Sequence, residues 1–123
     1  MERKDLNDLE IYQISMQIGD EVWDLVIEWD KFAKNSMGYQ IVRSADSIAA
    51  NISEGYGRHF FKENRQFSYI ARGSLYETKT FLLKAKRRKL VSEAVFEKMD
   101  AELTTLAKRL NAYIAYIESK LNK

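Results

Sequence analysis

A run of cations near residue 85 has the chemistry to neutralise phosphate. Five of the six residues from 84 to 89 are basic: Lys84, Lys86, Arg87, Arg88 and Lys89. The dipole of a helix favours each cation at its C-terminus by about 0.3 to 1 kcal/mol, which would explain one or two of them. The remainder favour a site for nucleic-acid phosphates, whose binding is independent of sequence and sensitive to salt. The alternative is a solvated helix end.

A second group of basic residues alternates with aromatic residues. The basic members are Arg58, His59, Lys62, Arg65 and Arg72, and the aromatic ones are Phe60, Phe61, Phe67 and Tyr69. Aromatic rings beside cations can stack on exposed bases. The rings are also typical of the edge of a helical core, which is the commoner role. We expect His59, the only histidine, to be a loop residue.

Glu54 is the carboxylate best placed for acid–base chemistry. A catalytic carboxylate needs a partner acid, base or metal, and the sequence offers little of this. Di-iron bundles pair glutamate with a histidine three residues later, whereas Tyr56 precedes His59 by that interval. No phosphate-binding glycine loop or nucleophile elbow is present. We therefore expect no enzymatic activity, no cofactor and no metal.

The same region predicts a structural polar network. Asn51, Glu54 and Arg58 follow one another at helical spacing, and Arg43 lies two turns earlier. We expect Glu54 to pair with Arg58 one turn on. Asn51 and Arg43 are expected to fix the register of the helix or to contact an adjacent subunit.

The composition limits the class of protein. The chain has 123 residues, which fit one domain with one core. It has neither cysteine nor proline, so disulfides are excluded and long uninterrupted helices are favoured. No apolar run is long enough to cross a bilayer, and the first residues carry no apolar signal core. These features predict a cytoplasmic protein without a membrane partner.

Charge is distributed unevenly along the chain. Residues 1–36 have a net charge of −5, residues 37–91 of +7, and residues 92–123 of 0. Such asymmetry can indicate a nucleic-acid surface. It can equally indicate that an acidic helix of one subunit lies beside a basic helix of the next.

Apolar spacing predicts an all-α fold, an up-down-up-down antiparallel four-helix bundle in a single domain over residues 1–123. The helices are expected at about 7–29, 36–55, 62–89 and 92–120. Asn35 or Ser36 is the expected N-cap of the second helix, and Ser92 that of the fourth. Gly55 and Gly57 are expected to supply left-handed positions at the end of the second helix. The fourth helix has the strictest core spacing: Phe96, Met99, Leu103, Leu106, Leu110, Tyr113, Ile117 and Leu121.

The first helix carries two apolar stripes where a bundle core needs one. One stripe contains Leu9, Tyr12, Met16, Gly19, Trp23 and Val26, and the other Ile11, Ile14, Ile18, Val22, Leu25 and Trp29. A helix that is apolar around most of its girth is either centrally buried or also faces another subunit, and in a domain this small we expect one of the two stripes to face another subunit. Gly19, and Gly73 in the third helix, are expected where another helix approaches closely.

Four segments carry a family resemblance: 5–12 (DLNDLEIY), 40–48 (QIVRSADSI), 51–58 (NISEGYGR) and 70–77 (IARGSLYE). They resemble the four-helix-bundle proteins encoded in intervening sequences of bacterial 23S ribosomal RNA genes, a family related to the accessory protein of diversity-generating retroelements. The resemblance implies a homopentameric ring of bundles with a plausible nucleic-acid role. Ala49 and, approximately, Ala33 replace prolines of the family pattern, which should straighten the helix and leave the bundle intact.

Two functions from different classes follow. The first is a non-enzymatic, oligomeric module that binds structured RNA, or a DNA–RNA hybrid, through phosphates. The second is a homo-oligomeric scaffold for a protein partner such as a reverse transcriptase. Location of the gene inside a ribosomal RNA gene would favour the first, and a neighbouring reverse-transcriptase gene the second.

Overall fold

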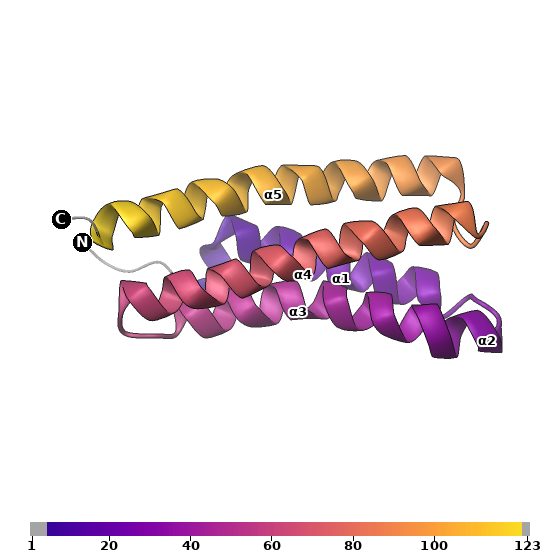
Figure 1. The fold of residues 1–123 in the computed structure, drawn as a ribbon, viewed down its shortest axis with the longest axis horizontal. Coiled ribbons are helices and arrows are strands. Elements are labelled where there is room, and N and C mark those ends of the chain that lie inside the picture. The colour runs from indigo at the N-terminus through magenta and orange to yellow at the C-terminus, as the bar shows by residue number, and fades with distance from the viewer. Residues whose placement is uncertain (1–4, 122–123) are drawn as a thin grey trace.

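The computed structural model describes residues 5–121 and shows an all-α four-helix bundle (Figure 1). Its long helices are α1 (Glu10–Val26), α3 (Tyr39–Tyr56), α4 (Phe61–Arg87) and α5 (Glu93–Leu121). The short elements are the 3₁₀ turn η1 (Leu6–Asp8), the helical turn α2 (Lys31–Ala33) and the π-helical segment η2 (Lys34–Gly38). Successive long helices run in opposite directions, as predicted.

The core lies where the apolar spacing places it. On α5, Met99, Leu103, Leu106, Leu110 and Ile117 are buried, Phe96 and Tyr113 are partly buried against the core, and Ile114 is buried in addition to the expected residues. The more deeply buried stripe of α1 is the one that contains Ile11, Ile18 and Val22, and it continues to Trp29 just after the helix. The other stripe leaves Met16 45% and Trp23 55% exposed, although it also contains the buried residues Gly19 and Val26. One stripe of α1 therefore packs into the core, and the other is only partly covered within the single chain.

Small polar residues contribute to the contact between α3 and α4. The hydroxyl of Thr78 donates to that of Ser44 over 2.9 Å, and Ser74 donates to Ser47 over 3.0 Å. Ser44 and Thr78 are fully or almost fully buried. Their short side chains let the two helices approach closely, and the hydrogen bonds satisfy groups that would otherwise be costly to bury.

The second helical stretch begins five residues earlier than the predicted 36–55. Asp30 is its N-cap: the side-chain Oδ1 accepts from the backbone N–H of Ala33 over 3.0 Å. Helical structure then continues through α2 and η2 into α3. The prediction that Asn35 or Ser36 caps this helix is therefore wrong, because the turn before them is already helical. Ser36 instead donates its hydroxyl to the carbonyl of Phe32 over 2.6 Å.

At three other helix ends, one prediction from the sequence is wrong, one left-handed residue was not predicted, and one predicted cap is confirmed. α3 ends at Tyr56 without any left-handed glycine, since no glycine within residues 5–121 has a positive φ. The left-handed residue is Lys89 instead, with φ 62°, after the end of α4. Ser92 does cap α5, because its hydroxyl accepts from the N–H of Val95 over 3.2 Å.

Between residues 5 and 121, no helix is both long enough and apolar enough to pass through a membrane.

Candidate nucleic-acid interface

One end of the bundle gathers cations from two separate parts of the sequence. Trp29 is buried, and its indole N–H donates to the carbonyl of Leu90 over 3.1 Å. Arg88 reaches the sulfur of Met37, with 3.5 Å between Nη1 and Sδ. These contacts bring α2 and η2 beside the α4–α5 turn, at the right of Figure 1. We call this region the basic end: Lys31, Lys34, Lys84, Arg87, Arg88 and Lys89.

Four of the five basic residues predicted between 84 and 89 to bind phosphate are available at the basic end. Lys84, Arg87, Arg88 and Lys89 are all exposed. Within the described part of the chain, Lys84, Arg87 and Lys89 make no ion pair, hydrogen bond or ring contact through their side chains. Lys86 is different, because its ammonium lies 3.1 Å from Glu93 and 4.6 Å from the ring centroid of Phe96. Lys86 therefore ties α4 to α5.

Sequence reasoning missed two cations, Lys31 and Lys34. Both are exposed and lie in the first turn of the helical stretch that leads into α3. The positive end of the helix dipole disfavours cations there. The favourable dipole interaction that could explain cations at the C-terminus of α4 therefore does not explain Lys31 and Lys34. Their spacing was visible in the sequence. The position of their segment beside the α4–α5 turn depends on the contacts of Trp29 and Met37, which link residues more than fifty positions apart.

The second basic set lies at the opposite end and along α4, where several members are engaged. Arg58 lies 3.4 Å from Glu54, 3.5 Å from Glu63, and over the ring of Phe67 at 4.9 Å. His59 and Lys62 are exposed. The charge of Arg58 is therefore balanced by two neighbouring carboxylates of the same chain.

Tyr69 organises the rest of that set. Arg65 and Arg72 lie over its ring at 5.9 Å and 5.1 Å, and Arg72 also donates to Asn111 over 3.1 Å. The Tyr69 hydroxyl donates to Glu118 over 2.5 Å, and this hydrogen bond raises the pKa of Tyr69. These contacts cross from α4 to α5, so the group stabilises the packing of the two helices.

The predicted polar network is only partly connected. Glu54 pairs with Arg58, as expected from their spacing. Asn51 instead donates to the carbonyl and hydroxyl of Ser47, over 2.8 Å and 2.9 Å. Arg43 is exposed and makes no ion pair or hydrogen bond within residues 5–121. The four side chains therefore do not form one network within a single chain.

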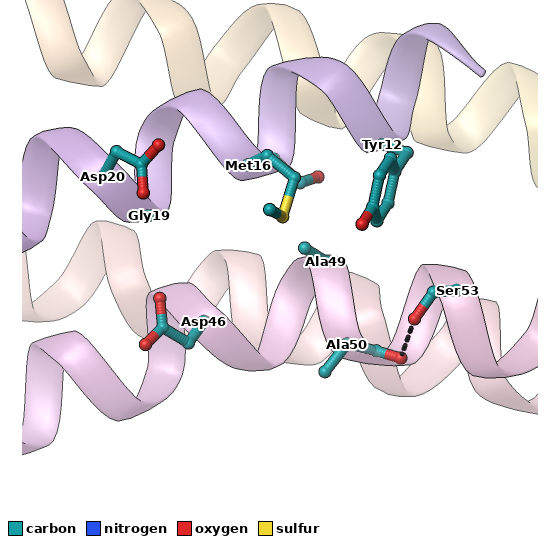
Figure 2. Close-up of a pocket in the computed structure, with 9 residues that line it drawn as sticks. Tyr12, Met16, Gly19, Asp20, Asp46, Ala49, Ala50 and Ser53 are labelled. Carbon is teal, nitrogen blue, oxygen red and sulfur yellow. Dashed lines mark hydrogen bonds between the residues drawn. The ribbon is translucent and has the colours of Figure 1, made fainter. Parts of the chain in front are cut away.

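A groove separates α1 from α3 on the exposed face of α1 (Figure 2). Its volume is about 290 Å³, and Tyr12, Met16, Ala49 and Ala50 supply much of its lining. Gly19 lies beside α3: a Cβ there would stand 2.9 Å from Oδ1 of Asp46. This agrees with the expected close approach of another helix at Gly19.

Asp20 and Asp46 add negative charge to the groove, from opposite helices. Partial burial, and then the charge of Asp20, raise the pKa of Asp46. Neither carboxylate has an ion-pair or hydrogen-bond partner within the described residues. The acidic groove and the basic end are therefore surfaces of opposite charge on one molecule.

Among residues 5–121, no three histidine, aspartate or glutamate side chains are grouped so that they could hold a metal ion.

The fold and the basic end define a helical bundle with a candidate phosphate-binding surface. Residues 7–112 match the model of the 23S rRNA-intervening sequence protein family, and the chain belongs to this family. This confirms the resemblance seen in the sequence. The further link to the accessory protein of retroelements stays a prediction.

A solved structure supports the same assignment. The chain is similar to a protein of unknown function from the S23 ribosomal protein family of Bacteroides thetaiotaomicron, with a TM-score of 0.75 and 25% identity. The match covers 85% of this chain and 97% of the other. No curated protein sequence matches the chain.

Proposed function

We propose that this protein is a non-enzymatic RNA-binding module whose basic end contacts phosphates. The observation that carries the proposal is the meeting of two sets of exposed cations, Lys31 and Lys34 with Lys84, Arg87, Arg88 and Lys89. Most of these cations lack an acidic partner within the described chain. Exposed cations on two adjoining segments attract a polyanion. The family's association with 23S rRNA genes supports RNA over other polyanions, and a DNA–RNA hybrid offers the same phosphates.

Assembly would strengthen such binding. The exposed apolar stripe of α1 supports a homo-oligomer, and the family resemblance favours a pentameric ring. Each copy in a ring would present one basic end, so several weak phosphate contacts would act together on one RNA. The proposal therefore needs only modest affinity from each subunit.

The proposal is tested by removing two cations that the fold does not use. Lys84→Ala with Arg87→Ala leaves the Lys86–Glu93 pair intact, unlike a change at Lys86. We expect weaker binding to a hairpin RNA in fluorescence anisotropy over a salt series. The slope of log K against log salt should become shallower by about 0.7 to 0.9 for each phosphate that the variant no longer neutralises.

Lys108→Ala with Arg109→Ala is the matched control. It removes the same charge from α5, away from the basic end, at the expense of a surface pair between Arg109 and Glu10 that contributes little. Equally weakened binding by both variants would show that only net charge matters and would contradict a defined site. No binding by the native protein at low salt would refute the proposed function.

A second candidate is a scaffold for a protein partner, for example a reverse transcriptase. The groove between α1 and α3, with Asp20 and Asp46 unpaired beside apolar side chains, favours it. Such a surface suits a basic, partly apolar protein segment. A native protein that assembles and yet binds no RNA at low salt would make this the better proposal.

A further inference from the structure

Phe32 is an aromatic side chain that the fold does not use. It lies in α2 at the basic end and is 84% exposed, more than any other large apolar side chain of residues 5–121. Its neighbours Ala33 and Met37 are buried, and Trp29 is buried under the α4–α5 turn. The hydrophobic contacts at this end are therefore made by other residues, and the ring of Phe32 remains open to solvent.

Exposed cations lie near Phe32, and Asp30, the N-cap of the same helical stretch, is the nearest carboxylate along the chain. Lys31 precedes it, Lys34 follows two residues later, and both are exposed without an ion pair within the described chain. Arg88 contacts Met37 in the same helical stretch. An exposed ring among unpaired cations is the arrangement with which proteins bind single-stranded nucleic acid, because the ring stacks on a base while the cations hold the backbone.

The other exposed phenylalanine in a turn region has a different environment. Phe60 is 62% exposed at the α3–α4 turn. Its ring packs edge-on against His59, with 4.6 Å between centroids, and the nearby Arg58 is paired with Glu54 and Glu63. Phe60 therefore serves as a matched control for Phe32.

We propose that Phe32 stacks on an unpaired base of the RNA whose phosphates the basic end contacts. The inference rests on the proposed function and adds a substrate class: RNA with an accessible single-stranded nucleotide, such as a hairpin loop or a strand end. Phosphate contacts alone would not distinguish a loop from a duplex. Stacking requires a base outside the helix, so Phe32 would supply that preference.

The test compares two RNAs and three variants by fluorescence anisotropy. The RNAs are a hairpin with an adenosine-rich loop and a blunt duplex of the same stem. We expect Phe32→Ala to bind the hairpin about tenfold more weakly, since each stacked base contributes substantially to affinity. Its affinity for the duplex and its salt slope should not change. Phe60→Ala should behave as native with both RNAs, and Lys84→Ala with Arg87→Ala should weaken both.

Two further readouts separate stacking from indirect effects. A 2-aminopurine base in the loop should be quenched by the native protein and by Phe60→Ala, but not by Phe32→Ala. Melting temperature and light scattering of Phe32→Ala should match the native protein, because the ring contributes little to the core.

Each other result has a distinct meaning. Native-like hairpin binding by Phe32→Ala overturns the stacking proposal and leaves phosphate binding intact. Equal weakening on hairpin and duplex, or altered assembly of Phe32→Ala, assigns the ring to a structural contact and also overturns it. Failure of the native protein to bind either RNA refutes the proposed function itself.

Discussion

Lys89 has a backbone conformation that favours glycine. Its φ is 62°, and the N–H groups of Leu90 and Lys89 donate to the carbonyls of Ala85 and Lys86 over 2.9 Å and 3.0 Å. This is the Schellman pattern, in which glycine is usual at the left-handed position. The chain therefore keeps a cation where the backbone alone would favour glycine.

We predict that Lys89→Gly stabilises the protein by about 1 kcal/mol, because it removes the left-handed strain of a residue with a Cβ. Lys84→Gly is the control: it lies within α4 and should destabilise by about 1 kcal/mol through poor helix propensity. Urea unfolding followed by circular dichroism measures both. A Lys89→Gly variant less stable than native would contradict the Schellman geometry.

Glu21 and Glu102 form a carboxyl pair between α1 and α5. Lys98 donates to both over 3.3 Å, and Gln17 donates to Glu21 over 3.0 Å and to Glu102 over 3.3 Å. Burial, then the hydrogen bond and charge of Glu21, raise the pKa of Glu102. Against the effect of burial, hydrogen bonds with Glu102, Gln17 and Lys98 lower the pKa of Glu21.

The raised pKa of Glu102 means that the folded state binds its proton more tightly than the unfolded state. This contribution to stability is present at low pH and disappears as the pH rises through the folded-state pKa. Glu102→Gln should therefore stabilise the protein at neutral pH, by less than about 1 kcal/mol. The stability gained by Glu102→Gln should shrink toward about pH 4, where the carboxyl of native Glu102 is protonated and therefore neutral, as glutamine is. Urea unfolding at both pH values measures this.

The start of the second helical stretch shows what a sequence can hide at the scale of an element. Asn35, Ser36 and Gly38 together are typical of a loop or a cap, and the sequence interpretation placed the helix boundary there. The structure instead uses Asp30 as the cap and absorbs the weak helix formers in the π-helical segment. A Cβ at residue 38 would stand 2.6 Å from Val26. The close packing against α1 therefore requires glycine there, in spite of its poor helix propensity.

Caps can be compared directly by mutation. Asp30→Ala should cost about 1 kcal/mol, because the N–H of Ala33 would have no side-chain acceptor. Ser36→Ala should change the free energy of unfolding by less than about 0.5 kcal/mol, as a surface position does. Thermal unfolding of the two variants measures the difference. The reverse order would restore the boundary expected from the sequence.

Replacing Gly73 and Gly55 by alanine should change the stability of the protein in opposite directions. Gly73 is exposed on α4, and a Cβ there would meet nothing within 4 Å, so the close helix approach predicted at this glycine is wrong. Gly73→Ala should therefore stabilise by about 1 kcal/mol through helix propensity alone. At Gly55 a Cβ would stand 2.6 Å from Oδ1 of Asn64 and 3.0 Å from the Cβ of Phe67. Gly55→Ala should destabilise by about 1 to 3 kcal/mol. Chemical denaturation measures both, and a Gly55→Ala variant more stable than native would contradict the close packing of α3 on α4.

The predictable part of the molecule is the part governed by periodicity. The core residues of α5 and of one stripe of α1 follow from their spacing, because the spacing alone determines which face of its helix each residue lies on. The basic end does not follow in the same way. Lys84, Arg87 and Lys89 form a visible run, whereas Lys31, Lys34 and Phe32 join it only through tertiary contacts of Trp29 and Arg88.

At the scale of the whole molecule, the acidic groove and the basic end are different surfaces: the basic end lies beside the α4–α5 turn, and the acidic groove lies between α1 and α3. Trp23 and Ile27 are 55% and 44% exposed on α1 and just after it, so the face of α1 that the core leaves open carries large apolar side chains. A surface of this kind, rimmed by polar residues, marks an interaction site.

Assembly through α1 can be tested by placing one negative charge on its exposed face. Trp23→Glu would bury a carboxylate in any interface formed by this stripe, which costs several kcal/mol when it is unpaired. We expect the native protein to be an oligomer in light scattering, and Trp23→Glu to be a monomer with an unchanged circular dichroism spectrum. Ile70→Glu places the same charge on α4 at a residue 44% exposed and should leave the oligomer intact. A native monomer at micromolar concentration would remove both the ring and the explanation for the second stripe of α1, and the exposed tryptophan would then need a different partner.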